Sequence, residues 1–518
     1  MRNAGRILND GLKCLLPLSA LATLSCRAGE ETMPPNIIYV FPDQFRGSAL
    51  AFWDEPEFSP YVRWKADPVH TPVLDSFASE SVVLANAMSN CPLSSPYRGI
   101  FLTGMYPERS GITLNCMSER PESSLREDAV CISDVLKAQG YSCGYIGKLH
   151  ADFPTRNDPA HPGHYVSDRR PEWDAYTPPE RRHGFDYWYS YGTFDVHKNP
   201  HYWDTDGVRH DPKEFSVKHE TDKAIEYLRN EHGERDKDAP FFLVVAYNPP
   251  HSPYSGPEDC MEEDYALYKG MSYKDLYVRD NADTTLVKAP SARYYFANVT
   301  AVDRGFGRIL DEVKRLGLDR NTIVVFTSDH GETMCSHGTL DPKNSIWTES
   351  FNVPMLIRYP EKIRPHVDTT LLSSIDIMPT LLSMAGLHDV VPSSAEGRDL
   401  SPLLMETGES CTAPSSVLYL RNLNGTTAPD GTVSGFFPEA RGIRTATHTM
   451  EIAVNRDWSL KSVTIFDDVA DPYQMCPIDR HDAPELFESL LAELSAKLRE
   501  ADDVWSRECV LDALDFND

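Results

Sequence analysis

Four short, uninterrupted runs of apolar residues constrain the fold of this chain more than any other feature. These runs are Asn36–Phe41, Cys143–Ile146, Phe241–Ala246 and Thr322–Thr327. Apolar runs of this length are typical of strands that are buried on both faces. Helical patterns precede the last three runs and span Ile132–Gln139, Ser216–Glu231 and Tyr294–Leu316. The alternation predicts an α/β fold, with a large, mostly parallel mixed sheet that is flanked by helices.

After about Ser415 the pattern changes to short strand-like pieces, followed by a polar amphipathic helix at Ala483–Arg499. We therefore expect a catalytic domain over residues 34–410 and a smaller C-terminal α+β subdomain over 415–518, containing an antiparallel sheet. The segments Asp152–Pro212 and Pro253–Pro290 have little periodicity, and insertions of this length are usually functional loops. Aromatic residues at Tyr187–Tyr191 and His201–Trp203 are consistent either with sugar binding or with loop packing.

The N-terminus has the pattern of an export signal. Basic residues come first, a short apolar stretch follows at Leu15–Leu24, and Ser25 precedes Cys26. This pattern predicts a signal peptide over residues 1–25, with Cys26 lipidated as in a bacterial lipoprotein. The protein would then be exported, to the periplasm or to the outer membrane or cell surface of a bacterium. The alternative is a plain secretory signal with an incidental Cys26.

The formal charge is −28, from 78 acidic and 50 basic residues. A surface this acidic repels nucleic acid and anionic lipid, so we expect no nucleic-acid partner and membrane contact only through a lipid anchor. Nine of the eleven cysteines follow the signal segment, and none has zinc-like spacing. In an exported protein these cysteines either pair or stay as buried thiols.

Polar side chains follow each predicted strand. They are Asp43 and Gln44, then Lys148 and His150, then His251, and finally Asp329 and His330. Ligands of open α/β sheets bind at the carboxyl ends of the strands, so these groups should meet at one edge. A single Asp after a strand is usually a capping residue, but four strands that all end this way are harder to explain by turn chemistry.

Four of these residues form a candidate cation site: Asp43, Gln44, Asp329 and His330. Ligation dominated by oxygen favours Ca²⁺ or Mg²⁺. The imidazole would also tolerate Mn²⁺ or Zn²⁺. We expect one divalent cation, with Ca²⁺ as the first choice.

The segment Cys91–Gly104 contains the pattern S-x-P-x-R, followed by an apolar turn and L-T-G, and it resembles the signature of the sulfatase family. Further matching pieces lie in the same order along Asn36–Ala501, and their ordered occurrence is highly specific. They are Gly147–His150, Asn248–His251, Ser328–Glu332 with Lys343, Ser374–Thr380, Gly397–Leu400 and Asp471–Tyr473. The resemblance implies an alkaline-phosphatase-like fold and the hydrolysis of sulfate esters, and we expect the substrate to be an O-sulfated glycan or mucin-type carbohydrate.

The resemblance also implies a modified nucleophile. A maturation enzyme would oxidise Ser94 to formylglycine, and the residue would then also contact the metal. One hydroxyl of the hydrated aldehyde would attack sulfur, and the other would release sulfate. Asp329 is a candidate base for the attack and His150 for the release.

The remaining roles implied by the resemblance concern charge and protons. Arg98, Lys148 and Lys343 would balance the charge of the sulfuryl group, as preorganised cations do in many active sites. His251, with Lys343, would protonate the leaving oxygen. Lys148, His251 and Lys343 would thus also bind substrate, and His337 resembles a family histidine that serves in substrate contact or in packing.

The chain departs from the common family pattern at two positions. Gln44 stands where a second Asp is usual, and His330 stands where Asn is frequent. Both lower the negative charge at the metal. Two other functions are open at this stage: a phosphatase or phosphodiesterase that uses unmodified Ser94, and an exported glycan-binding lipoprotein without activity.

Overall fold

The computed structural model describes residues 33–117, 120, 122–152, 174, 176–360, 362–408, 410–422, 424–427 and 433–516. The predicted signal peptide and Cys26 lie outside these residues. Residues Pro34–Asp518 form one compact unit, so the proposed division at residues 410–415 stays a prediction. No helix within the described ranges is both long enough and apolar enough to cross a bilayer.

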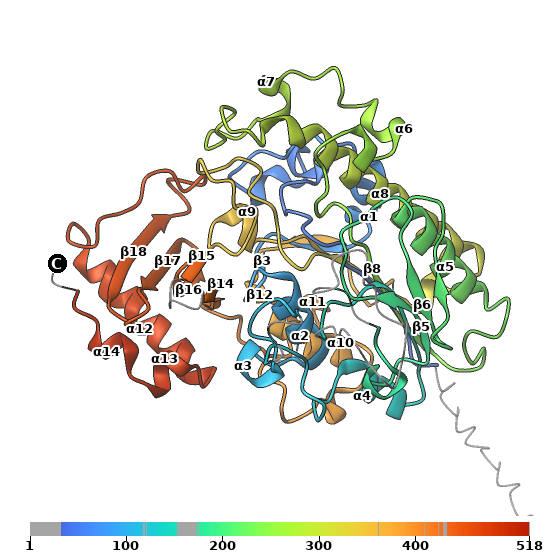
Figure 1. The fold of residues 1–518 in the computed structure, drawn as a ribbon. Coiled ribbons are helices and arrows are strands. Elements are labelled where there is room, and N and C mark those ends of the chain that lie inside the picture. The colour runs from blue at the N-terminus through green and yellow to red at the C-terminus, as the bar shows by residue number, and fades with distance from the viewer. Residues whose placement is uncertain are drawn as a thin grey trace, which may run out of the picture. The chain divides into compact units, whose positions relative to one another are not determined.

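A ten-stranded sheet organises the unit (Figure 1). Its strands, in spatial order, are β11 (His366–Asp368), β2 (Val82–Leu84), β10 (Met355–Arg358), β9 (Thr322–Thr327), β1 (Asn36–Val40), β8 (Phe241–Ala246), β4 (Ser142–Lys148), β5 (Tyr187–Tyr191), β6 (Tyr202–Asp204) and β7 (Arg209–His210). The four predicted strands are the neighbours β9, β1, β8 and β4, and all three pairings among them are parallel. Every residue of β4, β8 and β9 is buried, which explains the apolar runs within them.

Helices cover both faces of this sheet. The helices that share a hydrophobic core with one face are α1 (Pro72–Ala78), α5 (Ser216–Arg229) and α8 (Ala292–Arg315). Those on the other face are α2 (Ser94–Thr103), α4 (Ile132–Ala138) and α10 (Ile377–Met384). Successive residues of β1 alternate between the two cores, with Ile38 in one and Tyr39 in the other. The predicted helices begin and end within two residues of the observed ones.

A second, antiparallel sheet forms the C-terminal part, as expected. It consists of β13 (Ser416–Arg421), β16 (Glu439–Thr445), β17 (His448–Val454) and β18 (Leu460–Asp467). Helix α12 (Pro484–Glu500) contributes Leu490, Leu494 and Leu498 to its core. The remaining strands are β3 (Ala87–Met88), β12 (Leu372–Ser373), β14 (Asn424–Thr427) and β15 (Val433–Phe437). The remaining α-helices are α3 (Pro107–Ser110), α6 (Glu262–Tyr265), α7 (Tyr273–Leu276), α9 (Thr348–Phe351), α11 (Ser401–Leu404), α13 (Val504–Arg507) and α14 (Val510–Ala513).

The aromatic segments of the long insertion pack inside the protein. Tyr187–Tyr191 is strand β5, and Trp188 and Tyr191 are almost fully buried. His201 and Trp203 are buried as well. Of the two readings offered by the sequence, packing is therefore the one that describes these side chains. The nine cysteines after the signal segment are free thiols, and six of them are buried.

Candidate active site

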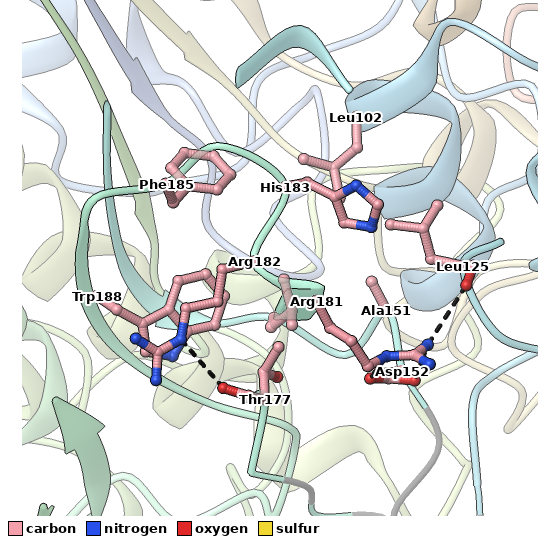
Figure 2. A pocket seen from close by; sticks show the side chains of 11 residues that line it. Leu102, Leu125, Ala151, Asp152, Thr177, Arg181, Arg182, His183, Phe185 and Trp188 are labelled. Carbon is pink, nitrogen blue, oxygen red and sulfur yellow. Dashed lines mark hydrogen bonds and ion pairs between the residues drawn. The ribbon is translucent and has the colours of Figure 1, made fainter. Parts of the chain in front are cut away.

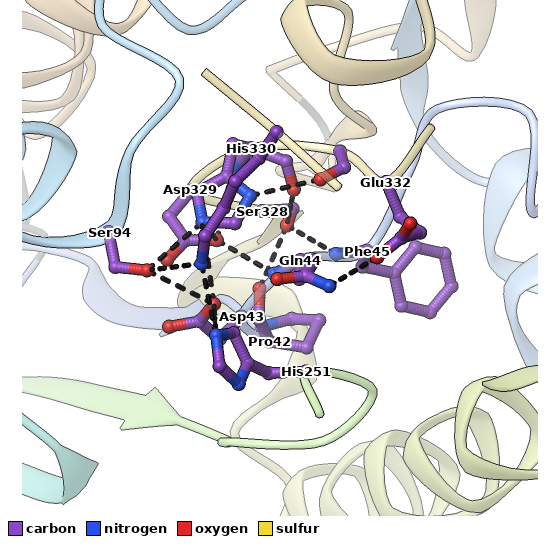
Figure 3. Close-up of polar contacts among 12 residues, drawn as sticks. Pro42, Asp43, Gln44, Phe45, Ser94, His251, Ser328, Asp329, His330 and Glu332 are labelled. Atoms are coloured by element: carbon purple, nitrogen blue, oxygen red, sulfur yellow. Dashed lines mark hydrogen bonds and ion pairs between the residues drawn. The ribbon is translucent and has the colours of Figure 1, made fainter. Parts of the chain in front are cut away.

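Ser94 is the first residue of α2, and its hydroxyl lies inside a cluster of charged and polar groups (Figure 3). Ser94 Oγ is 3.3 Å from Asp43 Oδ1 and 3.0 Å from His330 Nε2. The ammonium group of Lys343 donates to the same oxygen at 3.2 Å. The unpaired N–H groups at the start of a helix favour a bound anion. The position of Ser94 thus suits a nucleophile that attacks an anionic ester.

The C-terminal sheet supports the loop that precedes Ser94. The Asn90 side chain donates to the Leu418 carbonyl at 2.8 Å, and Leu420 N–H donates to the Asn90 carbonyl at 2.7 Å. Both partners belong to β13. Leu93 also packs in the hydrophobic core of this sheet. The position of the nucleophile therefore depends on contacts with residues more than 300 positions later in the chain.

Three candidate metal ligands meet beside Ser94. One ligand atom from each of Asp43, Asp329 and His330 lies within 4.8 Å of the others, and all three residues are buried. They come from the ends of β1 and β9, which are neighbours in the sheet. The structure therefore brings together the residues that the strand ends predicted.

Gln44 completes this group through its side-chain oxygen. Its amide nitrogen is held by the Glu332 carboxylate and by the Tyr254 hydroxyl, the latter at 3.2 Å. Its Oε1 is buried and has no hydrogen-bond partner among the described residues, and Figure 3 shows it on the side that faces Asp43. A buried acceptor without a partner costs free energy, and a bound cation would satisfy it. Two carboxylates, this oxygen and one imidazole suit a divalent cation.

The predicted cations are buried against these carboxylates. Arg98 Nη2 lies 3.1 Å from Asp43 Oδ2 and 3.4 Å from Asp329 Oδ2. Lys148 Nζ lies 2.7 Å from Asp43 Oδ2 and donates to Asn248 Oδ1 at 3.1 Å. A lysine ammonium has three N–H donors, so two are directed by Asp43 and Asn248. The third remains for an oxygen of the substrate or for the Asp195 carboxylate 3.9 Å away.

Gly147 allows the main chain to reach this point at the end of β4. Its φ is +97°, and a Cβ there would lie only 2.3 Å from the carbonyl oxygen of Ala246 on β8. Any other residue would clash with the neighbouring strand. The glycine before Lys148 in the sequence motif thus has a steric cause.

His251 and Lys343 form a pair at the site. Lys343 Nζ lies 3.0 Å from His251 Nε2 and 3.2 Å from His330 Nε2. His150 is also buried, and its Nε2 donates to the Cys116 carbonyl at 3.2 Å. In the neutral ring this leaves Nδ1 of His150 as the basic nitrogen.

The charges around the cluster shift the pKa values of its members. Burial opposes ionisation of Asp43, but nearby cations, Lys148 foremost, hold its pKa well below the usual range. Burial and the negative charge of Asp43 raise the pKa of Asp329 to about 7. Burial and the charge of Lys343 lower the pKa of His330, and they lower that of His251 to about 3. In neutral solution Asp43 is therefore ionised and Asp329 is close to half protonated, while both imidazoles are uncharged.

The contacts of His337 are with residues outside the Ser94 cluster. Its ring stacks on Trp347 at 4.2 Å between centroids, and its Nε2 is 3.1 Å from Glu349 Oε2. Glu349 is held in turn by Arg279 at 2.7 Å. These contacts describe a packed side chain, which was one of the two roles considered for His337.

Three further residues contact the site and were not singled out by sequence reasoning. Asn248 holds Lys148, Glu332 holds Gln44, and Asp195 lies 3.4 Å from His251 Nδ1. Asn248 is the first residue of the N-P-P-H segment, so its position after β8 could have indicated it. Asp195 comes from the long insertion, where no motif marks it.

A small pocket elsewhere is lined by residues of the long insertion, such as Asp152 and Arg181, and by apolar residues that precede it, such as Leu102 and Leu125 (Figure 2). Arg181 pairs there with Asp152 at 2.7 Å, and Arg182 donates to the Thr177 carbonyl at 3.1 Å. None of the predicted site residues lines this pocket. The Ser94 cluster is therefore the better candidate for the active site.

Comparison with known proteins agrees with this geometry. A family model described as Sulfatase matches residues 35–387. The chain is 54% identical over 499 residues to an endo-4-O-sulfatase of Bacteroides thetaiotaomicron, covering 95% of this chain and 98% of that protein. It is 33% identical over 486 residues to an ulvan-active sulfatase of Formosa agariphila, covering 90% and 81%. A solved structure from work on glycosaminoglycan metabolism by B. thetaiotaomicron superposes with a TM-score of 0.89 at 55% identity, covering 92% of this chain and 99% of that one.

Proposed function

Because this chain belongs to the sulfatase family of sulfuric ester hydrolases, we propose that it removes 4-O-sulfate groups from a glycosaminoglycan and acts at internal positions of the polymer. The endo-4-O-sulfatase relative supports the sulfated position and the internal action, since its similarity extends over nearly the full length of both chains. The related structure from glycosaminoglycan metabolism supports the class of polymer.

The observation that carries the catalytic proposal is the surroundings of Ser94 Oγ. Asp43, His330 and Lys343 all lie within 3.3 Å of it. We propose that Ser94 is converted to formylglycine by a maturation enzyme, as the S-x-P-x-R pattern implies. Hydrated formylglycine supplies two hydroxyls on one carbon, so that one can attack sulfur and the other can release sulfate.

We propose Ca²⁺ as the resident cation. Asp43, Gln44, Asp329 and His330 would hold it, together with the modified Ser94. The unpartnered Oε1 of Gln44 and the two buried carboxylates support this assignment. The cation supplies positive charge beside the nucleophile and the sulfuryl oxygens.

The side chains of the site would bind the ester and move its protons. Arg98, Lys148 and Lys343 would stabilise negative charge on the sulfuryl oxygens, because Arg98 and Lys148 are buried against Asp43 and Lys343 donates to Ser94 Oγ. His251 and Lys343 would give a proton to the sugar oxygen that leaves. His150 would accept a proton at Nδ1 during sulfate release. Asp329 would accept one during the attack.

We also propose that the protein is exported and anchored by a lipid at Cys26. The basic N-terminus, the apolar stretch Leu15–Leu24 and the following Ser25-Cys26 support this location. An enzyme that attacks large external polymers has to meet them outside the cytoplasm.

The test begins with mass spectrometry of the tryptic peptide Ala66–Arg98, from protein made in a host that has a serine-type maturation enzyme. Loss of two hydrogens at Ser94 is expected. Chondroitin 4-sulfate polymer and its oligosaccharides are then compared as substrates, with Ser94→Ala as control. Faster sulfate release from the polymer supports internal action. Unmodified Ser94 together with phosphoester hydrolysis would contradict the sulfatase mechanism.

A further inference from the structure

Asp195 lies on the segment that follows β5, in the long insertion, and its side chain reaches the active site. Only about a tenth of this side chain is exposed. The residue has a φ of +52°, which non-glycine residues rarely adopt. Such strained conformations gather at functional sites, where the surrounding structure enforces them.

The contacts of Asp195 lead to His251. Asp195 Oδ1 lies 3.4 Å from His251 Nδ1, and Thr193 Oγ1 donates to the same oxygen at 3.3 Å. The same segment makes a second contact, in which His197 Nε2 donates to the His251 carbonyl at 2.8 Å. The insertion therefore holds both the ring and the main chain of His251.

These contacts determine the tautomer of His251. Its Nδ1 is hydrogen-bonded to the Ser252 carbonyl at 2.9 Å, and the Asp195 carboxylate and the Ser252 hydroxyl both lie 3.4 Å from the same nitrogen. Nδ1 therefore carries the hydrogen of the neutral ring. Nε2 is left with its lone pair toward Lys343 Nζ, 3.0 Å away. A proton can thus pass between Lys343 and His251 on the side that faces Ser94.

We propose that Asp195 is a positioning residue that orients His251 for protonation of the leaving oxygen, an inference that rests on the proposed function. When the S–O bond breaks, its electron pair stays on the sugar oxygen, which takes a proton from the Lys343–His251 pair. The Asp195 carboxylate holds the ring in this orientation and takes no part in the proton transfer itself. Carboxylates orient histidines in this way in other catalytic sites.

Lys148 is the competing partner, since its Nζ lies 3.9 Å from Asp195. Two observations favour His251. The separation from Nδ1 is shorter, and Lys148 already contacts Asp43 and Asn248 at hydrogen-bond distance.

A double-mutant cycle tests the proposal on the glycan substrate. Asp195→Ala is expected to lower kcat about 10- to 100-fold with little change in KM. In a His251→Ala background the same change should have almost no further effect, because the side chain through which Asp195 acts is absent. In a Lys148→Ala background it should keep its full effect. Equal losses in the His251→Ala and unsubstituted proteins, or a loss that disappears only with Lys148→Ala, would overturn the proposal.

Two controls separate positioning from folding. Asp206→Ala changes an exposed aspartate of the same insertion and should leave the activity unchanged. Asp195→Asn keeps an acceptor oxygen and should recover part of the loss. Every variant is compared at equal formylglycine content, measured on the peptide Ala66–Arg98.

A readout that does not need activity separates this proposal from the proposed function. In protein labelled with ¹⁵N-histidine, and with the His251 signal assigned from a His251→Gln variant, the ring should show hydrogen on Nδ1. Asp195→Ala should shift the tautomer balance. An unchanged spectrum overturns the role of Asp195, whereas absence of sulfate release by the unsubstituted protein contradicts only the proposed function.

Discussion

Binding of the divalent cation should weaken as the solution becomes more acidic, because the cation competes with a proton for Asp329. In the cation-free protein, burial and Asp43 raise the pKa of Asp329 to about 7. Below that pH the carboxyl group is protonated, and the proton must leave before the oxygen can bind a cation. The pKa of Asp43 is held far lower by cations such as Lys148, and that of His330 is lowered by burial, so neither adds a second proton in this range.

The magnitude follows from the Asp329 pKa. For one competing proton the apparent affinity falls by a factor of 1 + 10^(pKa − pH), and the loss approaches tenfold per pH unit below about 7. Between about pH 8 and about pH 5.5 this amounts to a loss of roughly 30-fold, or about 2 kcal/mol. Titration calorimetry with Ca²⁺ on chelator-treated protein measures the affinity at each pH, and buffers of different ionisation enthalpy count the released protons.

The matched control is Asp329→Asn, which keeps the size of the side chain but cannot bind the competing proton. We expect weaker Ca²⁺ binding by this variant, with the pH dependence largely removed. An affinity of the unsubstituted protein that stays constant over this pH range would refute competition by a proton on Asp329. The same dependence in Asp329→Asn would assign it to another group.

Three substitutions test other parts of the structure. Lys148→Ala removes a buried cation beside Asp43 and should lower kcat/KM about 10²- to 10³-fold; a loss below tenfold in steady-state sulfate release would contradict its role at the sulfuryl group. Asn248→Ala leaves Lys148 with a single fixed acceptor. It should lower kcat about tenfold at unchanged formylglycine content, the loss that is typical when a residue that orients a ligand is removed. An unchanged kcat would show that Asp43 alone orients the ammonium. Both carboxylate oxygens of the buried Asp503 lie 3.0 Å from Arg441 Nε. Arg441→Met leaves Asp503 buried without this partner and should lower the free energy of unfolding by about 3–5 kcal/mol. Urea denaturation followed by tryptophan fluorescence measures this last change, and a loss below about 1 kcal/mol would mean that Asp503 finds another partner or water.

The central strands could be predicted because each carries its own signal. Strands buried on both faces need a near-continuous run of apolar residues, and β1, β4, β8 and β9 each contain one. Strand β16 carries no such signal, because its sequence contains Arg441 and Gly442 and looks polar. Arg441 is nevertheless buried, since Asp503 pairs with it and Trp505 lies over its guanidinium group. That burial depends on a partner 62 residues away and cannot be read from local sequence.

The chemistry of the site was largely determined by the sequence. Parallel strands bring their carboxyl ends to one edge, so the polar residues that follow them had to meet there. Asp43, Asp329 and His330 do so, and Ser94 joins them at the start of α2. The family resemblance added the reaction, which residue types alone left open between sulfate and phosphate esters.

Only the tertiary structure decided how these side chains are oriented and which other residues hold them. Glu332 turns the oxygen of Gln44 toward the carboxylates, and Asn248 and Asp195 contact Lys148 and His251. The partners in these pairs lie far apart in the sequence or outside any motif. The physical reason is that hydrogen bonds to a side chain exist only after separate segments pack together, whereas the hydrophobic pattern of a buried strand is already present in the unfolded chain.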